Sequence, residues 1–238
     1  MRARLPRSGT TPGGHQPRFE GFDVLSQADA WDPVTAGVVL RRVGPPPPIR
    51  YFSPAEEAVA RPLLDLILDQ HEEPRVPVLE MVDARLAELQ TDGWHYADLP
   101  PDPEAWSQTL AALDQDAHRS HGRGFAECDR DQQAGLLQAV LDLGPEIWHG
   151  MRAERVWSLW YRYACAAFYA HPWAWNEIGF PGPAYPRGYK NAGINTLEPF
   201  EQPDQRPVDP VAPVDHRGDQ QADRGDQQDG LQGEEAGR

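Results

Sequence analysis

The side chains best suited to hold a metal ion lie in a short polar stretch near the middle of the chain. His118 and His121 are separated by two residues, and Cys128 and Asp129 follow soon after them. Structural zinc sites use four ligands from His, Cys or carboxylate side chains, usually as two spaced pairs. This stretch offers at most three good ligands, and no partner pair occurs elsewhere. We therefore expect a solvated loop here and no metal site.

A second polar cluster could carry acid–base chemistry. Asp69, His71, Glu72 and Glu73 lie together at an expected helix end. Paired carboxylates act as general acid and base when they face each other at a fixed, buried separation. Adjacent residues on a helix do not face each other, and the Glu-Glu-Pro-Arg order is typical of a solvated turn. We expect a turn and not a catalytic pair.

The remaining candidate nucleophiles and bases are scattered along the sequence. A catalytic cysteine needs a nearby His and an Asn or Asp that orients it, and neither Cys128 nor Cys165 shows these partners in a recognisable pattern. His149 and His171 flank an aromatic stretch, where a structural, hydrogen-bonded role is more common than a ligand contact. Motifs for nucleotide phosphates, haem attachment, zinc peptidases and serine hydrolases are all missing. The sequence thus favours a chain that does not carry catalysis by itself.

The composition excludes several classes of partner. The 238 residues have a net charge of −15, which argues against binding to nucleic acid or to an anionic membrane. No stretch approaches the roughly 20 apolar residues that span a bilayer. No apolar region follows the first arginines, and no twin-arginine signal is visible. We expect a cytoplasmic protein, with export to the periplasm together with another subunit as the alternative.

Apolar residues recur at helical spacing through most of the sequence, and no alternating run is long enough to propose a sheet. The order Ser53-Pro54-Ala55-Glu56 predicts a capped helix start, and Pro62 should kink or restart that helix. We expect an all-α fold, an irregular multi-helix bundle. The expected helices cover about 34–43, 53–70, 77–89, 102–117, 129–143 and 152–170.

The last of these helices is expected to be the central one. Its apolar side chains cover most of its circumference, which is typical of a helix packed on all sides. They are Val156, Trp157, Leu159, Trp160, Tyr161, Tyr163, Phe168 and Tyr169.

Composition also predicts three regions along the chain. Residues 1–30 should form a flexible N-terminal arm that Phe19, Phe22, Val24 and Leu25 could anchor. Residues 31–195 should form the helical domain. Residues 196–238 should be a disordered acidic tail, because Asp, Gln, Gly, Pro and Arg supply too little apolar surface to offset the entropy of ordering.

The segment from Phe168 to Asn191, which we call the strap, is the most unusual part of the sequence. It combines Gly and Pro with Trp, Tyr and Phe and carries few charges. Gly and Pro disfavour a continued helix or a sheet, whereas aromatic side chains are costly to leave in water. We expect an ordered, irregular segment that lies on an apolar surface, either of the chain itself or of a partner.

The strap and the helices before it resemble the family called gluconate 2-dehydrogenase subunit 3, over roughly residues 30–195. The upstream part of the resemblance is the Tyr51-Phe52-Ser53-Pro54-x-Glu56 helix start, the Gly93-Trp94-x-Tyr96 segment and the helix from Gln132 to Leu137. In the strap it is carried by Phe168-Tyr169-x-His171-Pro172, by Trp175-Asn176-Glu177-Ile178-Gly179-Phe180-x-Gly182-Pro183 and by Tyr185-Pro186-x-Gly188-Tyr189.

The resemblance implies a helical small subunit without catalytic residues or a cofactor of its own. Such subunits accompany a large FAD-dependent sugar-acid or alcohol dehydrogenase of the GMC type, often with a cytochrome subunit. The large subunit carries FAD and the chemistry, and the small one supports its assembly, stability or export. Many members begin with a twin-arginine signal, which is not seen here.

We therefore predict that the strap docks on the large subunit, because Trp, Tyr and Arg are enriched at interface centres. The predicted interface residues are His171, Pro172, Trp173, Trp175, Asn176, Glu177, Gly179, Phe180, Gly182, Pro183, Tyr185, Pro186, Arg187, Gly188 and Tyr189. Two alternatives remain open. The chain could be a stand-alone enzyme that uses His149, His171 and Glu177, or the strap could close the chain's own core.

Overall fold

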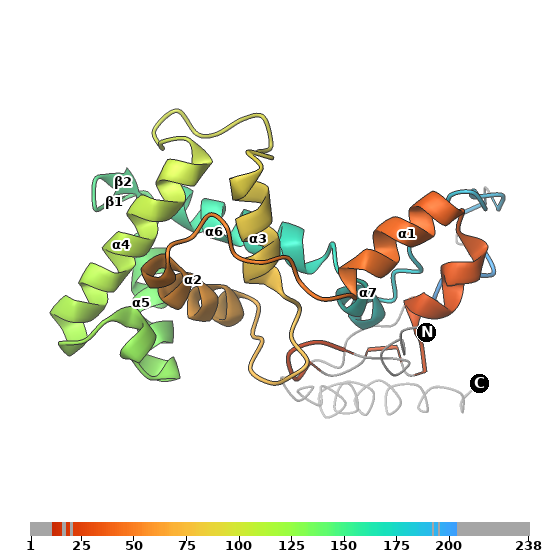
Figure 1. Ribbon diagram of the computed structural model, residues 1–238, viewed down its shortest axis with the longest axis horizontal. Helices are drawn as coiled ribbons and strands as arrows, with labels where there is room; N and C mark the ends of the chain where they lie inside the picture. The colour runs from red at the N-terminus through yellow and green to blue at the C-terminus, as the bar shows by residue number, and fades with distance from the viewer. Residues whose placement is uncertain (1–10, 16–17, 20, 192, 195, 204–238) are drawn as a thin grey trace, which may run out of the picture. The chain divides into compact units, whose positions relative to one another are not determined.

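Helices make up most of the described chain, as predicted (Figure 1). The structure, a computed structural model, describes residues 11–15, 18–19, 21–191, 193–194 and 196–203. The first ten residues and the predicted acidic tail beyond 203 lie outside these ranges. The elements are η1 (Val24–Ala30), α1 (Pro33–Arg42), α2 (Pro54–Ile67), α3 (Val78–Ala87), α4 (Asp102–His121), η2 (Phe125–Glu127), α5 (Arg130–Asp142), β1 (Ile147–Trp148), β2 (Met151–Arg152), α6 (Ala153–Phe168) and α7 (Pro172–Ile178), where η is a 3-10 helix.

Local capping sets where the helices begin. The Ser53 side chain accepts a hydrogen bond from the Glu56 backbone N–H, and the Glu56 carboxylate accepts one from the Ser53 N–H. This reciprocal pair satisfies two of the free donors at the start of α2. Of the kink or restart expected at Pro62, the restart is not seen, since α2 runs through this residue to Ile67.

A buried carboxylate shapes the chain before α2. Asp83, on α3, is fully buried and accepts hydrogen bonds from three successive backbone N–H groups, those of Arg50, Tyr51 and Phe52, at 2.7–2.9 Å. The carboxylate therefore supplies hydrogen-bond acceptors to the backbone between the four consecutive prolines Pro45–Pro48 and the start of α2.

The main core is assembled around α6, which contacts α2, α3, α4 and α5, as expected of a central helix (Figure 1). Trp160 is fully buried, and its indole N–H donates to the Thr109 hydroxyl of α4 at 3.0 Å. Although α6 is central, the neighbouring helices do not cover its whole circumference. Tyr161 and, just after the helix, Tyr169 are exposed, because the surrounding helices leave one side of α6 open.

A small hairpin precedes α6 and was not predicted. Strands β1 and β2 pair antiparallel, with Trp148 opposite Met151, around a turn of His149 and Gly150 that both have positive φ. Strands of two residues are too short to leave an alternating pattern in the sequence.

A second, smaller core is formed mainly by residues from the N-terminal part of the chain. Its buried members are Phe19, Phe22, Val24, Leu25, Trp31, Val39 and Trp175. The four apolar residues expected to anchor the N-terminal arm are thus all buried, and part of that arm forms η1. At the other end, Glu198 is buried, so packed structure continues beyond the predicted limit of 195. Among the described residues, no helix is long and apolar enough to cross a membrane.

Candidate partner-docking surface

The strap begins with a short helix, which differs from the irregular course that we expected. α7 starts with Pro172 at its first position, where no N–H is needed, and the His171 ring accepts a hydrogen bond from the Trp173 backbone N–H. It ends at Gly179, which has a φ of 69°. The stretch between Pro172 and Gly179 contains neither Gly nor Pro, so these residues delimit the helix and do not interrupt it.

One side of α7 is buried against the chain's own residues. Trp175 is only 5% exposed, and its indole N–H donates to the Tyr169 carbonyl at 2.6 Å. The Asn176 side-chain oxygen accepts a buried hydrogen bond of 2.8 Å from the Val24 backbone N–H. These contacts join α7 to η1 and make Trp175 part of the second core.

Two strap glycines allow a close approach to N-terminal aromatic rings. A Cβ atom on Gly179 would lie 2.6 Å from the Phe19 ring, and one on Gly182 would lie 2.4 Å from the Trp31 ring. Both glycines have positive φ as well. Only a residue without a side chain fits here, so the inner side of the strap is shaped to the second core.

Polar contacts complete this attachment. Arg187 donates to the Gln27 side-chain oxygen at 2.9 Å and to the carbonyls of Pro181 and Pro183. The two ring nitrogens of His15 lie 2.9 Å from the Glu177 carboxylate and 3.0 Å from the Leu68 carbonyl. Burial alone would lower the pKa of His15, but these acceptors raise it above its ordinary value because both are satisfied by the doubly protonated ring.

The other side of the strap exposes aromatic side chains. Tyr185 is 69% exposed and Tyr189 is 63% exposed, and Phe180 is also exposed while its ring meets the Trp175 ring edge-on at 5.3 Å. Large aromatic side chains on a segment with many fixed contacts are typical of interaction surfaces. We call Phe180, Tyr185 and Tyr189 the outer face of the strap.

The predicted interface residues therefore separate into three groups. His171, Pro172, Trp175, Asn176, Gly179 and Gly182 are buried within the chain. Trp173, Glu177, Pro183 and Arg187 are half-buried, and Phe180, Tyr185, Pro186, Gly188 and Tyr189 are exposed. Of the predicted interface residues, Trp175 packs in the chain's own core, whereas Tyr185 is exposed and can meet a partner.

The groups proposed for a stand-alone enzyme are not brought together. His149 lies before α6 in the hairpin, where its ring contacts the Asp116 carboxylate at 2.8 Å. His171 lies beyond the opposite end of α6, a helix about 24 Å long at about 1.5 Å per residue. Glu177 contacts His15 instead. Burial lowers the pKa of His171 to about 4, so its ring is neutral at pH 7.

The other polar candidates also lie apart from one another. His118 is exposed and contacts the Asp114 carbonyl of its own helix, and Cys128 is buried. Within the described ranges, no three His, Cys, Asp or Glu side chains are grouped closely enough to hold a metal ion. Near the earlier carboxylate cluster, Asp69 contacts Arg130 in a solvated setting.

Comparison with known protein families identifies the family of this chain. The family model of gluconate 2-dehydrogenase subunit 3 matches residues 54–182 of the 238, which is more than half of the chain. The chain belongs to this family. The match begins at the start of α2 and ends at Gly182, so it includes α7 and the inner side of the strap. Tyr185 and Tyr189 lie beyond it, as do the N-terminal members of the second core. Neither the curated proteins nor the solved structures gave a match.

Sequence reasoning missed the surface on which the strap lies. The second core joins residues near 19–39 to residues near 175–182, and no periodic pattern links segments so far apart. The sequence named Phe19 and Phe22 as possible anchors of the N-terminal arm, but nothing in it connected them, or Trp31, with the strap.

Proposed function

We propose that this chain is a non-catalytic accessory subunit that docks on a large FAD-dependent sugar-acid or alcohol dehydrogenase through the outer face of the strap. Membership of the gluconate 2-dehydrogenase subunit 3 family supports a role in a dehydrogenase complex. In this proposal the large subunit binds FAD and carries out the oxidation, and the small subunit supports its assembly and stability.

The observation that carries the proposal is the two-sided construction of the strap. Its inner side is fixed by Trp175, Gly179 and Gly182 against the second core, while Tyr185 and Tyr189 stay exposed. Holding the backbone in place before binding reduces the ordering entropy that docking would cost. Exposed tyrosines on such a backbone provide contact area with few rotatable bonds.

Co-expression separates this proposal from a stand-alone enzyme. The tagged chain would be purified alone and with a large FAD-dependent dehydrogenase subunit from the same genome, and each sample would be tested for flavin absorbance and for dye reduction with sugar acids. We expect flavin and activity only in the sample that contains the large subunit, with the two chains purifying together. Stoichiometric flavin or turnover in the chain alone would overturn the proposal, as would failure of the chains to purify together.

A further inference from the structure

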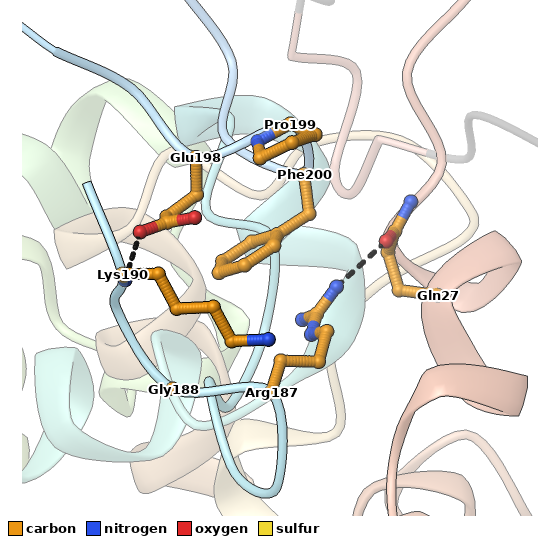
Figure 2. A pocket seen from close by; sticks show the side chains of 7 residues that line it. All are labelled: Gln27, Arg187, Gly188, Lys190, Glu198, Pro199 and Phe200. Carbon is orange, nitrogen blue, oxygen red and sulfur yellow. Dashed lines mark hydrogen bonds between the residues drawn. The ribbon is translucent and has the colours of Figure 1, made fainter.

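A pocket of about 380 Å³ lies between the end of the strap and residues 198–200 (Figure 2). Gln27 of η1 closes one side, and Arg187, Lys190, Glu198 and Phe200 contribute the larger side chains of the lining. Figure 2 shows the Lys190 amine and the Arg187 guanidinium directed into the same space. The pocket is within the size range of small-molecule sites.

Lys190 is the only lysine of the whole chain, beside 21 arginines. Its ammonium makes no hydrogen bond or ion pair with any described residue. The Arg187 guanidinium is held by Gln27 and by two strap carbonyls, and it stacks 3.8 Å from the centre of the Phe200 ring. Its Nε atom is buried and has no hydrogen-bond partner among the residues that the structure describes. Two cationic groups thus line one pocket, and no described carboxylate lies between them.

The one carboxylate of the lining is already engaged. Glu198 is 6% exposed, and its Oε1 atom accepts hydrogen bonds from the backbone N–H groups of both Lys190 and Asn191. In Figure 2 this carboxylate lies at the Lys190 backbone and not at the Lys190 amine. Glu198 therefore holds the strap end in place, while its charge reduces the formal charge of the lining from +2 to +1.

We propose that this pocket binds a small organic monocarboxylate, with the carboxylate group between Lys190 and Arg187 and the apolar body against Phe200 and Pro199. The two cationic groups suit a single carboxylate group, and Phe200 and Pro199 offer apolar contacts that an organic anion can use and inorganic phosphate cannot. Ammonium and guanidinium groups both form charge-assisted hydrogen bonds with carboxylate oxygens. This site requires no partner subunit, so it stands independently of the docking proposal.

The single lysine allows a direct test on the full chain alone. Slow acylation with an amine-reactive acetyl ester modifies Lys190 and the N-terminal amine, and peptide mass spectrometry reads the two rates separately. Sodium benzoate, sodium phosphate and sodium chloride would be compared at equal ionic strength. We expect benzoate to slow acylation of Lys190 saturably, by about threefold at twice its dissociation constant, with no change at the N-terminal amine. Equal Lys190 rates in benzoate and chloride would overturn the proposal, and so would stronger protection by phosphate.

Calorimetric titration with benzoate gives the second readout. Lys190→Gln removes the ammonium of an exposed side chain without touching the backbone contacts to Glu198, so the variant should fold and lose benzoate binding. Arg50→Gln, which removes a charge from another exposed side chain, is the matched control and should bind like wild type. Binding that is unchanged in Lys190→Gln, or lost equally in Arg50→Gln, would contradict the assignment.

Discussion

Replacing Gly182 with Ala tests whether the strap lies on the N-terminal residues as described. The new Cβ would lie 2.4 Å from the Trp31 ring, and Gly182 has a φ of +79°. The left-handed backbone costs an alanine about 1–2 kcal/mol, and the overlap with a buried ring adds about 1–3 kcal/mol. Gly188 is the matched control, because its φ is +70° and an added Cβ would meet nothing within 4 Å. Gly188→Ala should therefore show the backbone cost alone.

Urea unfolding followed by circular dichroism would give the global stability of both variants. Amide hydrogen exchange of residues 19–31 would show whether the second core opens while the main core stays closed. We expect Gly182→Ala to lose about 1–3 kcal/mol more than Gly188→Ala in one of these readouts. Equal effects of the two substitutions in both readouts would refute the contact between Gly182 and Trp31.

Three further substitutions test single interactions. Asp83→Asn should cost about 1–3 kcal/mol in urea unfolding, because the single amide oxygen of Asn cannot accept from all three backbone N–H groups that the carboxylate now binds. Replacing the exposed Glu88 by Gln is the control and should change stability by less than about 0.5 kcal/mol. His171→Asn keeps a good helix cap and removes a ring whose pKa is lowered by burial to about 4. As pH falls from 6.5 towards 4, the wild-type protein should therefore lose about 3 kcal/mol more unfolding free energy than this variant. Parallel pH profiles of stability for the two proteins would contradict this. The pKa of His15 is raised in the folded protein, so its effect on stability has the opposite pH dependence. The wild-type protein should lose stability relative to His15→Gln as pH rises above 6.5, and urea unfolding between pH 6 and 9 measures this loss.

The main helices could be predicted because their signals are local. Ser53 and Asp129 start α2 and α5 through capping boxes that are readable over four residues. α7 was missed because the Gly and Pro content of the whole strap was taken as evidence against any helix. Proline at the first helical position and glycine just past the end are the expected limits of a short helix, and Pro172 and Gly179 occupy those positions.

The docking surface could be predicted only in part. The aromatic composition of the strap identified both Trp175 and Tyr185, but composition does not distinguish a buried ring from an exposed one. Which ring is buried depends on Trp31 and Phe19, which contact the strap although they are far from it in the sequence. The pocket was missed for a related reason. The polar composition of residues 196–238 as a whole predicted disorder, so the ordered positions of Glu198 and Phe200 were not expected.

The most direct test of the account is the affinity of the large subunit for single-tyrosine variants. Tyr185→Ala and Tyr189→Ala remove exposed rings, so both should keep the wild-type circular dichroism spectrum and urea midpoint. Removal of an interface anchor costs about 2 kcal/mol or more, so we expect about thirtyfold weaker binding in surface plasmon resonance. Tyr161→Ala, which removes an exposed tyrosine of α6, is the control and should bind like wild type. Wild-type affinity in both strap variants, or a larger loss in Tyr161→Ala, would contradict docking through the outer face of the strap.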